Sequence, residues 1–522
     1  MSTRSSKEDI EMVEDCPPSS FFEEDHPDKT LKINSHGVTL VPQPSDDPRD
    51  PLNWSTWKKT VTLAIVTLAA FAGVLQSLAN ASGFAQQAAL YHKTSVQQSY
   101  SLSVATAGLA VGPFIWNPLA ARFGNCAMIL WSLVMTLGMN IWSARMVKPD
   151  QYIPFLLSRL CAGITGTAPA TIGTNVIIQI YFLHDRGKYI GIFSTCVLFG
   201  TMASSTLSGY IVEGASWVWQ FWYNVILGGV CIILCLLFLE EPIWNRPGGP
   251  EYPTPPEGWL TRRLATYAFT KRLTPKVPIE KSGSRAVILP LLIALSPVTM
   301  AIGLAHMIGF GFSIGITTFI PIYLQAPVMA GGYGFSPARN AAFTFVYWFA
   351  VLIAQVYVVL VSDRLSLWLC KRNGGAWKPE YRLHALWIPG LFAMPLGLGL
   401  FAATLVYHWH YMMLAFATFL VVFSNISIAP VCANYLIEAF APELANEVNG
   451  VLNSYRLIFG VAIGFFLFPW ADNVGIKWTY GTQAFLAIFA FGMMASVMKF
   501  GQRMRLRNLV KAQSEEGMKV IS

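Results

Sequence analysis

The chain has 522 residues, of which 54% are hydrophobic and only 12% are charged. So apolar a composition would leave a soluble globular protein with too few polar groups for its surface, which favours a membrane protein. The net charge of +8 reflects basic residues in loops that we predict to be cytosolic, so it does not require a nucleic-acid partner.

The chain begins with a polar segment that is rich in Asp, Glu, Ser and Pro. It lacks the basic and then apolar pattern of a cleaved signal peptide, so we predict a disordered cytosolic tail over residues 1–56. The acidic stretch Glu8–Asp28 is compatible with a regulatory or degradation signal, but a plain solvated tail is the simpler explanation.

Two groups of apolar segments, at residues 57–239 and 287–500, flank a polar cytosolic loop at residues 240–286. A segment that crosses a hydrocarbon core of about 30 Å must be helical to satisfy its backbone. We therefore predict an all-α membrane protein with twelve transmembrane helices in two six-helix halves. The spans lie near Lys59–Asn80, Ser99–Ala120, Ala127–Val147, Phe155–Tyr181, Tyr189–Val212, Phe221–Leu239, Val298–Leu324, Ala341–Val361, Ala385–Tyr407, Met412–Ile437, Gly450–Trp470 and Gly481–Phe500. The stretch Val287–Pro297 is either an interfacial helix or an early start of the seventh span.

The basic residues predict the orientation, because Lys and Arg accumulate in cytosolic loops. The predicted outer side holds only Lys93, Arg145, Lys148, Arg339 and Lys477. The central loop alone holds Arg246, Arg262, Arg263, Lys271, Arg272, Lys276, Lys281 and Arg285. Both termini, including the tail at residues 501–522, are thus expected in the cytosol. The plasma membrane is the expected location, with the vacuole or another internal membrane as the alternative.

Two short motifs carry a family resemblance. Asp50-Pro-Leu-Asn-Trp54-Ser55 precedes the first predicted span, and Lys378-Pro379-Glu380-Tyr-Arg382-Leu383 follows the eighth. With the six-plus-six pattern, they resemble the major facilitator superfamily and its fungal twelve-span drug:proton antiporter-like group. The resemblance covers nearly the whole chain after Asp47. It implies a carrier that works as a monomer, whose halves rock about a substrate cavity near mid-membrane.

The loop after the second span resembles the inner-gate motif of that superfamily. Pro118, Arg122 and Gly124 match it, whereas the usual Gly, Asp and basic pair are replaced by Asn117, Ala121, Asn125 and Cys126. A short echo, Asp363-Arg364, follows the eighth span. The resemblance thus implies gates at both loops. At the first loop, the ionic interaction between the halves that is usual in the family is expected to be altered.

The fourth span carries Arg159, followed by Gly163 and Gly166, which resembles an arginine-and-glycine motif linked to substrate and proton coupling. An Arg within a span is costly unless it faces a cavity or a partner, so a functional role is the default, with a structural Arg as the alternative. In the fifth span, Ser204, Ser208 and Gly209 stand where the antiporters carry Gly-Pro-x-x-Gly-Gly, and small residues permit close helix contact.

Polar residues within other spans are further candidates for the substrate cavity, although amides in spans commonly bond neighbouring helices instead. They are Gln76, Asn175, Gln179, Asn425, Asn434, Asn453 and Arg456. No Asp or Glu lies clearly at mid-membrane, so a neutral or anionic substrate is favoured over a cationic one. Proton coupling would use Glu213, Glu447 or Asp472 at span ends, or His306, or be absent.

No phosphate loop, nucleophile elbow or metal-ligand spacing occurs in a soluble stretch, so we expect no enzyme, cofactor or ATP-driven pump. The expected function is export of a drug-like compound or fungal secondary metabolite. Uptake of a nutrient is the first alternative, and a transport-dead receptor or scaffold is the second. The expected partners are a small-molecule substrate and membrane lipid. Asn80-Ala-Ser82 forms a glycosylation sequon near the outer end of the first span.

Overall fold

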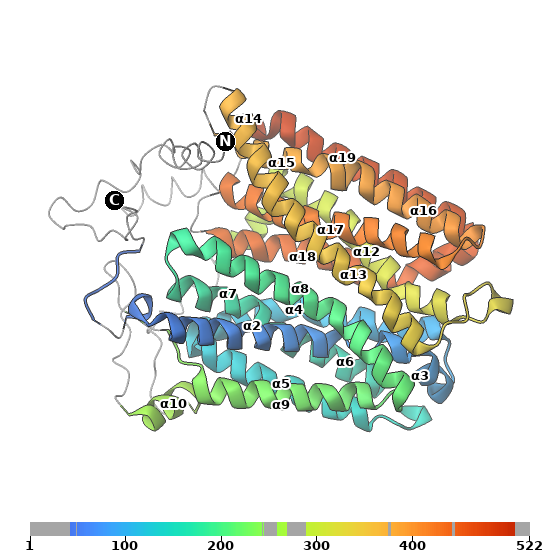
Figure 1. The fold of residues 1–522 in the computed structure, drawn as a ribbon, viewed down its shortest axis with the longest axis horizontal. Helices are drawn as coiled ribbons and strands as arrows, with labels where there is room; N and C mark the ends of the chain where they lie inside the picture. Colours follow the sequence, from blue (N-terminus) through green and yellow to red (C-terminus); the bar gives the residue numbers. More distant parts are fainter. Residues whose placement is uncertain are drawn as a thin grey trace, which may run out of the picture.

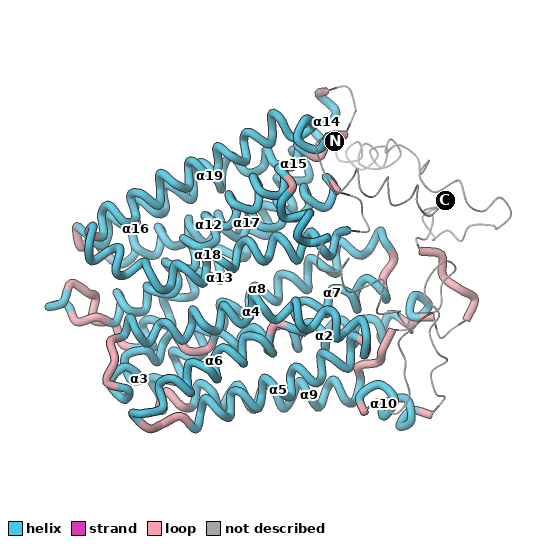
Figure 2. The backbone as a smooth tube through the Cα atoms, turned by 180° about the vertical axis from the view of Figure 1, so that it is seen from behind, coloured by secondary structure: helices cyan, strands magenta, loops and turns pink. Residues whose placement is uncertain are grey.

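The computed structural model describes residues 42–47, 50–242, 244, 258–268, 289–373, 377–440 and 444–506. Throughout these residues the regular structure is helical, and no strand occurs among them (Figures 1 and 2). The acidic stretch Glu8–Asp28 and most of the predicted tails and central loop lie outside the described residues.

The first half contains eight α-helices, some of them joined end to end. They are α2 (Thr56–Leu78), α3 (Phe84–Tyr91), α4 (Ser95–Phe123), α5 (Asn125–Arg145), α6 (Tyr152–Gly166), α7 (Ala168–Ile180), α8 (Leu183–Gly214) and α9 (Trp219–Phe238). A short helix, α10 (Trp259–Tyr267), belongs to the predicted central loop.

The second half is built in the same manner. Its helices are α12 (Pro297–Gln325), α13 (Pro337–Tyr357), α14 (Asp363–Arg372), α15 (Glu380–Leu383), α16 (Met394–Val406), α17 (Tyr411–Ala439), α18 (Ala445–Val474) and α19 (Ile476–Leu506). Residues 289–295 form a separate helical turn, and Ser296 then caps α12, so the stretch Val287–Pro297 is not a smooth start of the seventh span.

Eleven helical segments of the described chain are long and apolar enough to cross a membrane. The remaining predicted span is divided into α6 and α7, which meet at Thr167 and have 15 and 13 residues. Pro169 near the start of α7 lacks the N–H that an unbroken helix would use there, which accounts for a break at this point. The all-α fold in two halves is therefore confirmed, with the fourth predicted span built from two helices.

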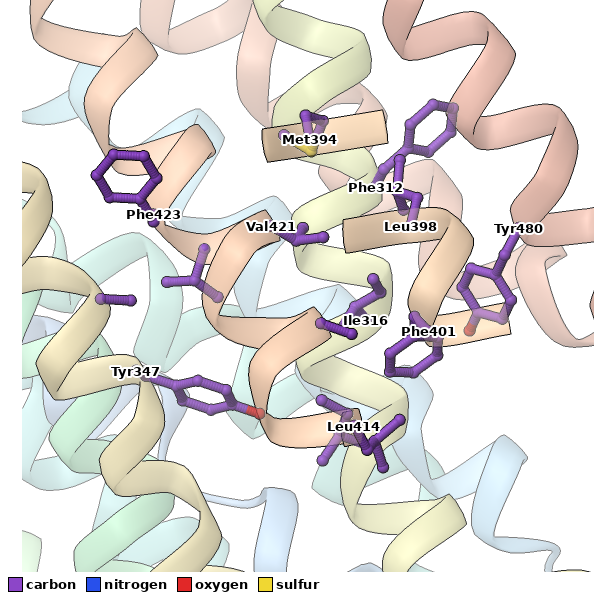
Figure 3. Packing of buried hydrophobic residues seen from close by; sticks show 14 of the residues in the cluster. Phe312, Ile316, Tyr347, Met394, Leu398, Phe401, Leu414, Val421, Phe423 and Tyr480 are labelled. Carbon is purple, nitrogen blue, oxygen red and sulfur yellow. The ribbon is translucent and has the colours of Figure 1, made fainter. Parts of the chain in front are cut away.

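Figure 1 shows α2 to α9 as one bundle and α12 to α19 as a second bundle beside it. Each has its own apolar core. In the second half, Figure 3 shows Phe312 and Ile316 of α12 packed with Leu398 and Phe401 of α16 and with Val421 of α17. Such close packing holds the helices of this half together.

Large apolar side chains also point away from the bundles. On α9, Ile226 is 64% exposed and Ile233 is 57% exposed, although the opposite face of the same helix is buried. A soluble monomer rarely exposes so continuous an apolar surface. The exposed faces of these helices therefore fit contact with lipid.

Two adjacent carboxylates stabilise the end of the first half that the basic-residue pattern predicts to be inside. Glu241 accepts hydrogen bonds from the backbone nitrogens of Asn125 (2.6 Å) and Cys126 (2.7 Å), so it caps the first turn of α5. Burial raises the pKa of Glu241, and these hydrogen bonds partly offset the rise. Glu240 pairs with Lys58 (2.6 Å) and with Arg263 of α10 (3.7 Å). These contacts hold α10 against the first half.

Candidate functional site

The two halves meet along one seam between α8 and α13. The hydroxyl oxygens of Thr206 and Thr344 lie 2.6 Å apart, and the indole Nε1 of Trp348 donates to Thr206 (3.0 Å). Gly209 lies so close to α13 that an added Cβ would come within 2.5 Å of the Ala341 side chain. Further along, the Glu213 carboxylate accepts from the backbone N–H of Ala338 (3.2 Å) at the first turn of α13.

A second seam joins α4 to α18. The rings of Tyr100 and Phe465 lie 5.0 Å apart, and Gly464 faces the Ser103 side chain at a distance that leaves no room for a Cβ. Both seams lie toward the ends of the helices that the basic-residue pattern predicts to be outside.

The ion pairs described at the opposite ends, which join Lys58 and Arg263 to Glu240 and Arg382 to Asp363 and Glu438, lie within one half each. Arg382 pairs with Asp363 (3.0 Å) and with Glu438 (2.7 Å), and all three residues belong to the second half. In the first half the corresponding pair is Lys58 with Glu240. The described contacts therefore close the predicted outer side of the protein.

Crosslinking can test this closure. We expect the double variant Thr206→Cys/Thr344→Cys to form a disulfide under mild oxidation, because the two Oγ positions are close enough for bonding sulfurs. The crosslink should hold the outer seam shut and stop transport until it is reduced. Controls are each single variant and the pair Thr195→Cys/Thr344→Cys, since Thr195 is half-buried and lies 11 residues, about three turns of α8, before Thr206. Efficient crosslinking of the control pair alone would contradict the seam.

Arg159 is fully buried between helices of the first half. Its Nη2 donates to the backbone oxygens of Gln76 (3.2 Å) and Ser77, and its guanidinium lies 5.1 Å from the centre of the Phe221 ring. Its Nε and Nη1 have no hydrogen-bond partner among the described residues. Arg159 therefore combines a structural link to α2 with two donors that remain for another ligand.

The other candidates for the substrate cavity in the first half differ in how far their side chains are buried. The Gln76 side chain is fully buried, and its amide has no partner in the described part of the chain. Asn175 and Gln179 are half-buried and lie one turn apart on α7. Gln76 thus belongs to the buried surroundings of Arg159, whereas Asn175 and Gln179 are more accessible.

In the second half, Arg456 is half-buried on α18 and its guanidinium lies 5.0 Å from the centre of the Phe310 ring on α12. His306, one turn before Phe310, is buried and close enough to interact electrostatically with Arg456. Asn453 is half-buried one turn from Arg456. The fold thus brings together a histidine of α12 and an arginine of α18 whose proximity the sequence does not indicate.

Two amides of α17 have different surroundings. Asn425 is 8% exposed in the middle of α17, but Asn434, nearer the end of that helix, is exposed. Asn425 therefore remains a candidate for the wall of the substrate cavity. Asn434 lies more than two turns away from it along α17.

Asn80 is not the accessible glycosylation site that its sequon suggests. Its side chain is fully buried; Nδ2 donates to Ser101 (2.6 Å), and Oδ1 accepts from Gln87 (2.6 Å) and Gln220 (3.0 Å). Gln98 extends the network by donating to Gln87 (2.6 Å). In this fold the acceptor nitrogen of the sequon already donates a hydrogen bond within the core, which disfavours a glycan at Asn80.

The gate-motif residues lie at or near the predicted inner ends of helices in both halves. Pro118 lies within α4, Arg122 is exposed in its last turn, and Gly124 ends it with a φ of +104° that favours glycine. Asp363 belongs to the triad with Arg382 and Glu438 described above, while Arg364 is exposed. Glu438 and Glu241 are inner-end carboxylates whose roles the motifs did not indicate.

The proton-coupling candidates lie far apart. Glu213 contributes to the outer seam, and Asp472 is exposed near the end of α18. Glu447 is half-buried in the first turn of α18, with a buried Oε2 that has no partner among the described residues. His306 is the candidate that lies beside another ionisable side chain within the span. Searching the described residues finds no group of His, Cys, Asp and Glu that could hold a metal ion.

Small residues provide the close helix contacts. An added Cβ on Gly163 would come within 2.1 Å of the Ala105 carbonyl oxygen of α4, and one on Gly166 within 2.5 Å of the Gly73 carbonyl oxygen of α2. Ser204 and Ser208 are buried on α8. Gly209 differs from these, because it serves the contact between the halves.

Solved structures with this fold are transporters. The chain superposes on the proton:xylose symporter XylE with a TM-score of 0.59 at 13% identity, covering 85% of this chain and 97% of XylE. A bacterial homologue of the lysosomal transporter Spinster, solved inward-facing and unoccupied, gives a TM-score of 0.53 at 14% identity, covering 87% and 99%. At such identities the likeness shows the fold alone.

Sequence comparisons find fungal relatives over nearly the full length. The chain is 24% identical over 499 residues to MFS transporter fsa7 of Fusarium sp. (strain FN080326), covering 92% of this chain and 93% of fsa7. It is 26% identical over 471 residues to the efflux pump radE of Floropilus chiversii, covering 88% and 83%. The profile of the Major Facilitator Superfamily matches residues 60–465. Together with the two-half helical fold, this match shows that the chain belongs to the major facilitator superfamily.

Proposed function

We propose that this chain is a secondary active transporter that exports a drug-like compound or fungal secondary metabolite, driven by an ion gradient. The observation that carries the proposal is the arrangement of the halves. Described contacts join them at the predicted outer ends, while the inner ion pairs stay within one half. This arrangement is one state of an alternating-access cycle and suits loading from the cytosol. The efflux pumps among its relatives support export over uptake.

We infer a neutral or anionic substrate that bears oxygen acceptors. Arg159 and Arg456 both keep donor nitrogens without partners in the described part of the chain. The described carboxylates that served as candidates, Glu213, Glu447 and Asp472, lie near the ends of α8 and α18. A cation would therefore lack a buried counter-charge at mid-membrane.

We further infer that the protein works as a monomer in the plasma membrane with both termini in the cytosol. The position of the basic residues supports this orientation. It is consistent with the seams, because the side opposite α10 and the inner ion pairs is then the outside.

The expected result in cells is a higher internal level of the substrate when the gene is deleted. Untargeted comparison of the metabolites in deletion and parent strains identifies the compound. It should then accumulate in inside-out vesicles only while a proton gradient is present. External protease should remove a C-terminal tag from these vesicles but not from intact cells.

Three results would contradict the proposal in different ways. Lower internal levels after deletion indicate uptake, and unchanged levels across the metabolites indicate a receptor or scaffold. Vesicle transport that persists down a substrate gradient after the proton gradient has collapsed identifies a facilitator. Vesicles from cells that lack the protein are the control.

A further inference from the structure

No described carboxylate forms an ion pair with the guanidinium of Arg456. None of the ion pairs of the described residues involves it, and its buried Nε has no hydrogen-bond partner there. An arginine within a span is costly without an acceptor, and Arg remains charged at physiological pH. The cost falls if a ligand supplies the missing negative charge.

The surroundings of Arg456 favour a flat ligand. One face of the guanidinium lies against the Phe310 ring at 5.0 Å, so its in-plane N–H groups are the ones available to an acceptor. His306 is 1% exposed, and its Nε2 has no partner among the described residues. Its ring centre lies 6.3 Å from that of Phe310. An aromatic surface thus adjoins two nitrogen groups that can bind an oxygen.

Arg456 lies on the predicted inner side of the described contacts between α4 and α18. The contacts of Gly464 and Phe465 with α4 lie eight and nine residues beyond Arg456 and thus ~12 Å or more further along α18. Arg456 itself is half-buried, so part of its side chain is accessible. Arg159 differs, because its buried guanidinium already donates to two backbone oxygens. The second half therefore presents its arginine to a ligand in the described state.

We propose that His306, Phe310 and Arg456 form an anion-binding subsite for the carboxylate or acidic hydroxyl group of a flat aromatic molecule that enters from the cytosol. The carboxylate would accept paired hydrogen bonds from Arg456, and the Phe310 ring would contact the aromatic body. This subsite deepens the proposed transport function and rests on it for the direction of entry.

Two dyes with the same xanthene ring system and opposite charges test the subsite. Fluorescein, an anion, and rhodamine 123, a cation, are titrated against the purified full-length chain in phosphatidylcholine nanodiscs, with fluorescence anisotropy as the readout. We expect fluorescein to bind at least about tenfold more tightly than rhodamine 123, since a charge-assisted hydrogen bond is worth about a factor of ten or more.

Variants separate binding from folding. Arg456→Met should weaken fluorescein binding about tenfold, and Arg456→Lys should restore part of it, because the charge remains while the fork is lost. His306→Phe should weaken it less. Lys371→Met, which removes an exposed basic residue of α14, should bind as the parent does. Thermal unfolding of each variant in the nanodiscs shows whether the protein is intact.

The proposal is overturned if rhodamine 123 binds as tightly as fluorescein or if neither dye binds. It is also overturned if an intact Arg456→Met protein binds fluorescein like the parent. Gradient-driven movement in vesicles does not depend on these results, so a failed subsite leaves the transport function standing.

Discussion

Gly163→Val is expected to prevent the first half from folding. The Cβ position at Gly163 lies 2.1 Å from the Ala105 carbonyl oxygen and 3.0 Å from the Gly108 Cα, so α4 and α6 touch through their backbones. Neither of these backbone atoms can turn away as a flexible side chain could. Adding three carbons there forces the helices apart, at a cost of about 3 kcal/mol or more.

A matched substitution distinguishes this clash from a general effect of valine. Gly138 lies on α5, and nothing is within 4 Å of its Cβ position, so Gly138→Val should remain folded. The measurement is the yield of monodisperse protein in detergent and its melting temperature. A Gly163→Val protein that melts within a few degrees of Gly138→Val would show that the contact is looser than described.

The sequence predicts where most of the spans lie along the chain, because hydropathy shows which segments prefer lipid. The break at Thr167 is less visible, since Pro169 is compatible with either a kink or a new helix. The eighth predicted span continues through a π-helical segment at Val358–Ser362 into α14, well past its apolar part. Charged residues there extend the helix beyond the membrane, where hydropathy no longer follows it.

Contacts between distant segments are what the sequence could not provide. The Asn80 sequon is a local pattern, whereas the partner that buries its amide, Gln220, lies 140 residues away. Glu241 caps a helix that begins 116 residues earlier. Hydropathy places His306 and Arg456 in spans but does not indicate that they lie close enough to interact electrostatically. Side-chain partnerships follow from the packing of helices, which composition alone does not specify.

The structure strengthens both explanations for Arg159. Its hydrogen bonds to the backbone oxygens of Gln76 and Ser77 link α6 to α2, as a structural residue would. Its unpartnered Nε and Nη1, and the unpartnered amide of Gln76, are what a ligand-binding residue would show. Because Arg159 is buried with no counter-ion among the described residues, the second explanation is the more economical one: a structural link alone needs no permanent charge.

Arg159→Met is therefore expected to abolish transport of the compound identified in vesicles, while the protein still reaches the membrane in normal amounts. Arg159→Lys should be impaired, because an ammonium keeps the charge but loses the planar fork that can hold two oxygens at once. Loss of a charged hydrogen bond of about 2 kcal/mol would by itself slow transport roughly thirtyfold.

The two explanations predict different amounts and different thermal stabilities for the Arg159→Met protein. If Arg159 only links helices, Arg159→Met leaves the Gln76 and Ser77 oxygens without their donor, and the protein should disappear from the membrane or melt well below the parent. If it binds substrate, the stable variant should be inactive. Transport by Arg159→Met at the parental rate would exclude the binding role, and the neutral or anionic substrate preference would then depend on Arg456 alone.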